Sequence, residues 1–139
     1  MKLRALVWLV LLCVPFLLAM GTGDSEGPTR IPEPSADFRV RLTDQEGTRV
    51  VLTHFSIEGQ VFVLGRMGHG QVAVPLEKVK EVEITNQGDA LKARIVLSQG
   101  PPVEIRVKPT LTATGKTDFG NYRIPLGEVS RIEVLGRGR

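Results

Sequence analysis

Apolar and polar residues alternate in short stretches of the chain from residue 37 onward. Every second residue is apolar in 38–42, 91–97 and 103–107, and most residues between them are charged. Alternation with a period of two predicts β-strands that bury one face. Turn residues separate these stretches at a spacing of about 8–12 residues, which is typical of an all-β sandwich or barrel. No stretch there has a helical period long enough for a helix of several turns.

A stretch of twenty residues occurs twice, fifty residues apart. Residues 65–84 align without a gap with residues 115–134, and six of the twenty aligned positions are identical. A random pairing would give about one identity. The repeat signature comprises Gly65, Gly70, Pro75 and Leu76 in the first copy and Gly115, Gly120, Pro125 and Leu126 in the second. One supersecondary unit used twice explains the period. We therefore expect β repeat 1 over 37–85, a connecting turn over 86–89 and β repeat 2 over 90–135.

Each predicted repeat contains about five strands, because an upstream alignment at an offset of 53 adds two strands to each copy. Gly70 and Gly120 are expected to supply a positive φ in a hairpin turn. Pro75 and Pro125 cannot donate a ladder hydrogen bond, so each predicts the end of a strand. The apolar spacing after proline predicts one short 3₁₀ turn and a last strand. The first copy has three extra residues near 55–60.

This order of strand, glycine turn, strand, 3₁₀ turn and closing strand is similar to that of small Sm-like or SH3-like barrels. Residues 114–134 also resemble an element of uncharacterised exported proteins of Gram-negative bacteria. The resemblance implies two tandem five-stranded barrel units, or alternatively one ten-stranded β-sandwich, and a location in the cell envelope. It brings no activity with it. The chain lacks the internal Sm signature for uridine-rich RNA, so no nucleic-acid partner is expected.

The first 21 residues predict a signal peptide. Lys2 and Arg4 precede an uncharged run over 5–20, and small residues stand at 19 and 21, so cleavage is expected between Gly21 and Thr22. The run is shorter than the roughly 18–20 residues that span a bilayer. We therefore expect a periplasmic or secreted protein. An uncleaved N-terminal helix that anchors the chain in the membrane is the less favoured alternative.

Removal of the signal peptide changes the cysteine count and the charge balance of the chain. The remaining chain has no cysteine, so the hydrophobic core must stabilise it without a disulfide. It retains 16 Lys and Arg residues against 15 Asp and Glu residues, and this near-neutral balance argues against nucleic-acid binding. Residues 22–36 contain three prolines and predict a flexible linker. Residues 136–139 form a short basic tail.

One hairpin face differs between the two copies. It is apolar in the first copy, at Phe62, Leu64 and Ala73, but the aligned residues of the second copy are Thr112, Thr114 and Arg123. Burial of Phe62 and Leu64 would contribute roughly 1.5–3 kcal/mol each. We therefore expect another part of the chain, a second copy of the protein or a partner to cover this candidate interface.

Six basic residues point outward on strands that should be equivalent in the two copies. This candidate anionic-polymer face comprises Arg39, Arg41, Lys92, Arg94, Arg106 and Lys108. A continuous basic face would attract an anionic envelope polymer such as lipopolysaccharide. An ordinary charged surface is the favoured alternative, because acidic residues lie between these positions.

Residues that would support catalysis are scarce. His54 lies in a β-stretch and His69 lies in a turn between two glycines, and neither neighbours a serine or carboxylate at a suggestive spacing. Glu83 and Glu133 recur between the copies, and we expect them to face solvent or to form ion pairs across the pseudo-symmetry. No phosphate loop or dinucleotide fingerprint is present. We therefore predict no catalytic residues, no metal site and no cofactor.

These observations favour a non-enzymatic exported β-module that acts through protein–protein contact in the cell envelope. Its partner is unknown, and self-association is included in this prediction. The alternative is a protein that binds an anionic envelope polymer through the basic strand face. A small hydrolase is the third reading, and it would need an active site built from residues to which we assign structural roles.

Overall fold

The computed structural model describes residues 30–138. The predicted signal peptide, its cleavage site between Gly21 and Thr22, and residues 22–29 of the predicted linker lie outside the described residues. Between residues 30 and 138, no helix is long and apolar enough to cross a membrane. The signal peptide and its helix therefore stay predictions.

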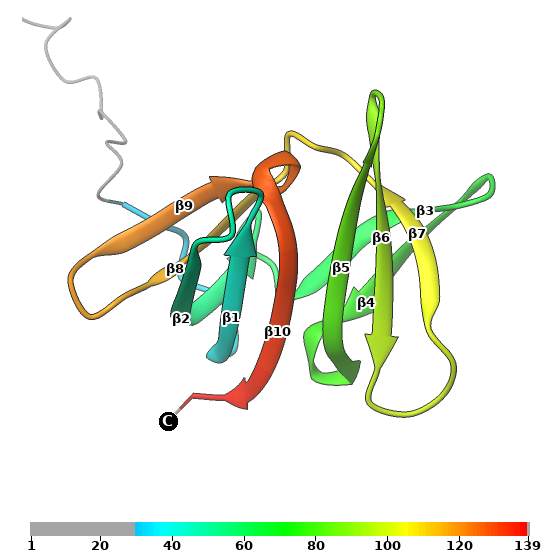
Figure 1. The fold of residues 1–139 in the computed structure, drawn as a ribbon. Coiled ribbons are helices and arrows are strands. Elements are labelled where there is room, and N and C mark those ends of the chain that lie inside the picture. The colour runs from blue at the N-terminus through cyan, green and yellow to red at the C-terminus, as the bar shows by residue number, and fades with distance from the viewer. Residues whose placement is uncertain (1–29, 139) are drawn as a thin grey trace, which may run out of the picture.

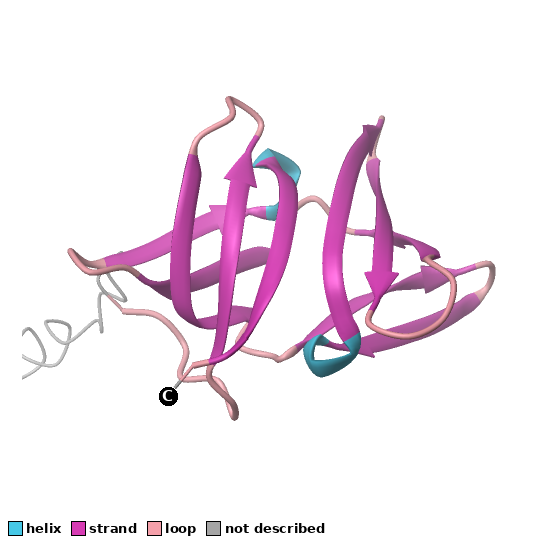
Figure 2. Ribbon diagram, turned by 60° about the horizontal axis from the view of Figure 1, so that its bottom comes forward, coloured by secondary structure: helices cyan, strands magenta, loops and turns pink. Residues whose placement is uncertain are grey.

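Residues 30–138 form ten β-strands and two 3₁₀ turns, which confirms the all-β fold class and the short 3₁₀ turns. The elements are β1 (Phe38–Asp44), β2 (Arg49–Ile57), β3 (Phe62–Met67), β4 (Gly70–Pro75), η1 (Leu76–Lys78), β5 (Val79–Gln87), β6 (Ala90–Leu97), β7 (Val103–Val107), β8 (Thr112–Lys116), β9 (Asn121–Pro125), η2 (Leu126–Glu128) and β10 (Val129–Arg137). The strands form one curled antiparallel sheet in the order β4-β3-β7-β6-β5-β10-β1-β2-β8-β9 (Figure 1; Figure 2).

Two strands are longer than the sequence predicts. β5 continues to Gln87, into the predicted connecting turn 86–89, and β10 continues to Arg137, into the predicted basic tail 136–139. Arg137 also forms an ion pair with Glu77, in which Nη2 and Oε2 are 3.1 Å apart. Its guanidinium carbon lies 5.5 Å from the ring centroid of Phe38. The first residues of the predicted tail are therefore part of the sheet.

The centre of the sheet is an approximate twofold axis between β5 and β10. Ile132 of β10 pairs with Val82 of β5, and these two residues are aligned with each other in the sequence. The neighbouring pairs are Arg131 with Glu83 and Glu133 with Glu81, which the same axis exchanges. Such a pairing of a surface with its own equivalent is the arrangement of an isologous dimer, here within one chain.

The axis divides the sheet into two halves of five strands each. We call β10, β1, β2, β8 and β9 half-sheet A, and β5, β6, β7, β3 and β4 half-sheet B. Half-sheet A combines two strands of predicted repeat 1 with three strands of predicted repeat 2, and half-sheet B has the opposite composition. Figure 1 shows β3–β7 on one side of the molecule and the other five strands on the other side.

The expected tandem arrangement, in which each copy folds into a barrel of its own, is therefore not confirmed. The physical cause lies in the connections 58–61 and 108–111, which cross between the half-sheets. The second strand of each copy consequently pairs with the third strand of the other copy, as β2 does with β8 and β7 with β3. The alternation of apolar residues along each strand is the same whether the strands pair within one copy or between the two copies.

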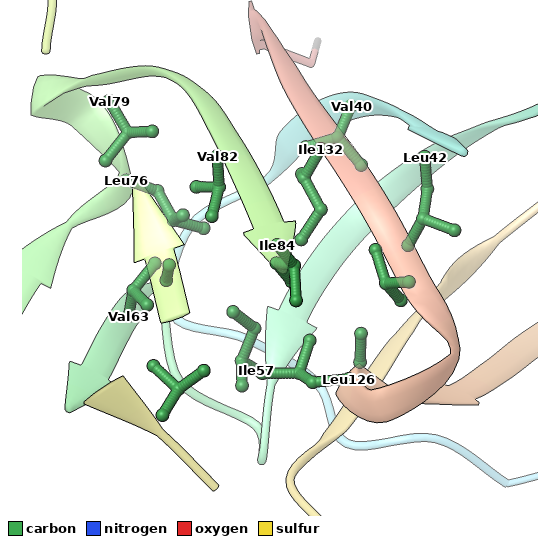
Figure 3. Close-up of a cluster of buried hydrophobic side chains, with 14 of the residues drawn as sticks. Val40, Leu42, Ile57, Val63, Leu76, Val79, Val82, Ile84, Leu126 and Ile132 are labelled. Atoms are coloured by element: carbon green, nitrogen blue, oxygen red, sulfur yellow. The ribbon is translucent and has the colours of Figure 1, made fainter. Parts of the chain in front are cut away.

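One hydrophobic core connects the two half-sheets. Its buried side chains form a single cluster, and the residues labelled in Figure 3 come from both halves. The predicted inward positions Phe38, Val40 and Leu42 of β1 are 0–3% exposed, so the period-two pattern assigned this face correctly. Leu76 and Leu126, which begin the 3₁₀ turns, are each 1% exposed. Both therefore cover an end of the core.

The glycines of the repeat signature have different roles in the structure. A Cβ atom on Gly65 would lie 2.6 Å from Cδ1 of Ile105, and a Cβ atom on Gly115 would lie 2.7 Å from Cβ of Leu52. These glycines permit the close approach of a neighbouring strand. The prediction of a positive φ at Gly70 is wrong, because the hairpin turn comprises residues 68–69 and the positive φ, 60°, belongs to Gly68.

Candidate functional site

A groove with a volume of about 590 Å³ lies on half-sheet B, beside the connection that leads to β8. Its lining residues are Leu64, Gly65 and Arg66 of β3, Gln71 of β4, Asp89 and Ala90 at the start of β6, Arg106 and Val107 of β7, and Lys108, Pro109 and Leu111 of the connection. The floor is mostly apolar and the rim is mostly basic. This combination is typical of a binding groove.

The groove exists because β7 separates from β3 after one residue pair. The two strands pair only at Arg66 with Arg106, whereas the corresponding strands β2 and β8 of half-sheet A pair at three positions. Pro109 follows the end of β7 by two residues, at an offset of 53 from Ser56, which pairs with Thr114 in half-sheet A. Proline has no N–H, so it cannot continue the ladder. Residues 62–64 therefore have no described strand partner on the side of the groove.

The residues of the candidate interface lie at this open edge. Leu64 lines the groove and is half-buried, as is Phe62, whereas Ala73 opposite Leu64 is exposed. In half-sheet A, the position of Leu64 is taken by Thr114, which is 2% exposed. Its hydroxyl lies 2.9 Å from that of Ser56. The same position is thus closed in one half and open in the other.

Three cationic side chains line the groove. Arg106 donates a hydrogen bond from Nη2 to the carbonyl oxygen of Gly68 at 3.2 Å. Arg66 and Lys108 are exposed, and neither forms an ion pair with another residue between 30 and 138. Asp89 is the one acidic residue of the lining. The groove therefore has an uncompensated positive charge.

The other members of the candidate anionic-polymer face lie apart from the groove. Arg39 and Arg41 are on β1, and β10 and β5 separate this strand from β6, which carries Lys92 and Arg94. Most of these cations are paired with glutamates, in the ion pairs Arg41–Glu133 at 3.1 Å, Lys92–Glu104 at 3.3 Å and Arg94–Glu83 at 3.8 Å. The outer face of the central strands thus alternates in charge.

Both repeated glutamates participate in ion pairs, but only Glu83 forms one across the pseudo-symmetry as expected. Arg131 of β10 contacts Glu81 of β5 at 2.7 Å and Glu83 at 3.6 Å, and these pairs cross the approximate twofold axis. Glu133 pairs with Arg41 instead. The side chains are partly exposed, so each pair contributes little to stability.

His54 has a structural role in the part of the chain that the structure describes. Its backbone has a φ of 51°, at a bulge in β2, and its N–H donates to Oδ1 of Asp37 at 2.7 Å. The ring lies between Oδ2 of Asp37, 3.6 Å from Nε2, and the hydroxyl of Thr53, 3.2 Å from Nδ1. Because the shortest contact of the carboxylate is with the backbone, Asp37 stabilises the bulge. His69 is exposed in its turn.

The segment 30–36, the last part of the predicted flexible linker, lies against half-sheet A. Oε2 of Glu33 is 3.8 Å from Nζ of Lys116, and Arg123 donates a hydrogen bond to the carbonyl oxygen of Arg30 at 2.9 Å. A Cβ atom on Gly59 would lie 3.1 Å from Cβ of Pro32. Lys116 is aligned with Arg66 of the groove. A carboxylate thus contacts this basic position in half-sheet A.

The titratable groups of residues 30–138 include no cluster of three or more His, Cys, Asp or Glu residues that could hold a metal ion.

Burial raises the pKa of the Tyr122 hydroxyl above 10.0, and the negative charge of Asp44 adds to this effect. Tyr122 lies on half-sheet A, away from the groove. The arrangement of the groove is therefore suited to binding through apolar contact, positive charge and backbone hydrogen bonds.

Sequence reasoning found Leu64, Arg106 and Lys108 but missed that they share one groove. It also missed Arg66 and Pro109. A signal for Pro109 was present, because a proline that follows the alternating stretch 103–107 by two residues predicts the end of that strand.

Comparisons with known proteins place the chain in a family. A family model described as "Uncharacterised protein" matches residues 34–137. A curated relative is an "Uncharacterized protein" of Aquifex aeolicus (strain VF5), which is 24% identical over 106 residues, covering 76% of this chain and 80% of the relative. No solved structure matches the chain. The matched range contains all ten strands of the described region, and therefore both half-sheets.

Proposed function

We propose that this chain, which belongs to this family of uncharacterised proteins, is a non-enzymatic module that acts through protein–protein contact at the groove of half-sheet B. The observation that carries the proposal is the open edge of β3. Residues 62–64 have no described strand partner there, and the half-buried Leu64 lines the groove beside them. Unpaired strand edges and apolar surface are both covered in most proteins, and a partner would cover them here.

Half-sheet A supports this proposal because it shows the same position in a covered state. Thr114 pairs with Ser56 and is buried, and residues 30–36 lie along the adjoining strands. The chain supplies no equivalent cover for half-sheet B among residues 30–138. A second molecule in the groove would make the two half-sheets alike.

The cell envelope is the proposed location, since residues 1–21 have the composition of a signal peptide. N-terminal sequencing of the protein from a periplasmic extract should begin at Thr22. A chain that begins at Met1 in the cytoplasm would contradict this part of the proposal. We also propose that each half-sheet is an Sm-like or SH3-like unit, supported by its five strands and by the 3₁₀ turn that precedes β10 in half-sheet A and β5 in half-sheet B.

Binding of an anionic polymer receives less support. Three of the six basic residues that would form the binding face are paired with glutamates. The unpaired cations Arg66 and Lys108 lie beside an apolar floor. A polymer of sugars and phosphates would leave this floor uncovered, so a protein partner fits the groove better.

Photo-crosslinking tests the proposed contact. A photoreactive amino acid replaces Leu64 in the groove or, as the control, Val51, which is 40% exposed on β2 of half-sheet A. We expect a discrete adduct from position 64 in intact cells and no equivalent adduct from position 51. The mass of the adduct distinguishes a partner from a second copy of the chain. The same adducts from both positions, or none from either, would contradict the proposal.

A further inference from the structure

We propose that the groove binds an extended peptide that carries a carboxylate and adds as a strand to the open edge of β3. This inference rests on the proposed function, because it names the chemical class of the partner at the same groove. Addition of a strand to a sheet edge is a common mode of peptide recognition, in which main-chain hydrogen bonds provide affinity and side-chain pockets provide specificity.

The backbone of β3 is oriented for such an addition. The hairpin of β3 and β4 closes at Met67 with Gly70 around a two-residue turn, so the odd-numbered residues of β3 form the backbone hydrogen bonds with β4. Val61 continues this pattern, because its carbonyl oxygen accepts a hydrogen bond from the N–H of Leu76 at 2.9 Å. The N–H and C=O of Leu64 therefore point away from β4, toward the groove. No described strand pairs with β3 there beyond Arg66.

Half-sheet A contains a natural template for the bound peptide. Ser56 and Ile57 pair with β8, and the N–H of Glu58 donates to the carbonyl oxygen of Thr112 at 2.9 Å. The Glu58 carboxylate in turn accepts a hydrogen bond from the N–H of Thr112 at 2.7 Å. A segment that is extended at Ser56 and Ile57 and turns at Glu58, where φ is 53°, thus completes the edge of β8 with one carboxylate. Thr112 is aligned with Phe62 of β3.

The side chains of the groove specify how its ligand should differ from this template. Ser56 faces Thr114, but the aligned residue of β3 is the apolar Leu64. The ligand should therefore carry an apolar residue where the template has serine. The positive charge of Arg66 and Lys108 favours a ligand that carries a carboxylate. At the position of Glu58 in the template, this carboxylate would accept a hydrogen bond from the N–H of Phe62, and such charge-assisted bonds are stronger than neutral ones.

The chain itself cannot close this edge in the way that half-sheet A does. Strand β2 has nine residues and reaches Ile57, whereas β7 has five residues and ends at Val107. Pro109 then follows the end of β7 by two residues and has no N–H to donate to a ladder. The free edge of β3 is therefore a property of the sequence, and a separate segment must supply the missing strand.

Fluorescence anisotropy with a labelled probe peptide tests the inference on the chain from Thr22 to Arg139. The probe has the sequence of residues 53–60 with S56V and blocked termini. We expect saturable binding that about tenfold higher salt weakens markedly. The same peptide with E58Q should bind about tenfold more weakly. The unmodified template, with serine in place of valine, should also bind more weakly because it lacks the contact with Leu64.

Two protein variants locate the binding. Arg66→Glu should weaken binding of the probe about tenfold or more. Arg39→Glu makes the same charge change at an exposed position of β1 and should change binding by less than about twofold. Both side chains are exposed, so both variants should fold. Equal effects of the two substitutions would overturn the inference, because they would show attraction to the overall charge only.

Hydrogen exchange of single amides separates strand addition from adsorption. The Leu64 amide should gain protection when the probe binds, whereas the Val63 amide, which already bonds to β4, should not. Binding without protection of Leu64 would overturn the inference. If no probe binds but the photoreactive residue at position 64 still gives a discrete adduct, the peptide inference fails and the proposed protein contact remains. If neither result is obtained, both fail.

Discussion

Half-sheets A and B have the same strand order, yet one edge is closed in A and open in B. In half-sheet A, the long strand β2 follows β8 through a bulge at His54, and Ser56 pairs with Thr114. In half-sheet B, β7 ends at Val107 and a proline follows two residues later. A few residues therefore determine whether this fold has a groove. The two half-sheets thus share a strand order while only half-sheet B has the groove.

The crossing of the chain between the half-sheets explains how one half can change without loss of the other. Both halves share a single core, so half-sheet A stabilises the fold around half-sheet B. The pairing of β5 with β10 provides a further link. The open edge of β3 costs backbone hydrogen bonds, and the intertwined arrangement offsets this cost.

The largest expected effect comes from separation of the two copies. A chain that contains residues 37–89 alone has β1 and β2 of half-sheet A but β3, β4 and β5 of half-sheet B. We expect it to be unfolded as a monomer, or to form a dimer in which two copies exchange strands as the single chain does. Circular dichroism and sedimentation would show which. A cooperatively folded monomer of residues 37–89 would contradict the exchanged topology.

The strands and their buried faces could be predicted from the sequence, but their partners could not. Alternation at 38–42, 91–97 and 103–107 depends only on which side of a strand meets the core, and the structure confirms these strands. The pairing of Thr53 with Lys116 joins residues of different copies. A pairing within one copy would bury the same side chains. Hydrophobic pattern therefore does not distinguish a tandem arrangement from an exchanged one.

The groove could be predicted only in part. The apolar face at Leu64 was visible as a difference between the copies, and in the structure Leu64 is half-buried and lines the groove. Leu64 lies in one groove with Arg66 and Lys108 because β7 stops pairing with β3 after one residue pair. The pairing of these two strands is a long-range property of the fold, although Pro109 marks in the sequence where it stops.

An exchange of Leu64 and Thr114 should have unequal effects on stability. Thr114→Leu adds volume at a buried site and removes the hydroxyl partner of Ser56, so we expect a loss of about 2–3 kcal/mol in the free energy of unfolding. Leu64→Thr alters a half-buried side chain at the groove and should cost less than about 1.5 kcal/mol. Urea unfolding of both variants measures the difference. Equal losses would show that the two positions are packed alike.

The smallest expected effect concerns Tyr122, the one tyrosine of the chain. Burial and the charge of Asp44 favour its neutral form, so its pKa in the folded protein lies above the value of 10.0. The corresponding stability is present below pH 10 and is lost as the pH rises through the raised pKa. The near-ultraviolet absorbance of tyrosinate should therefore titrate at a higher pH in the folded chain than in denaturant. Asp44→Asn should reverse the smaller part of this difference. The same midpoint in folded and denatured chains would show that Tyr122 is as accessible as an unfolded tyrosine, and that half-sheet A is more open at β9 than the structure indicates.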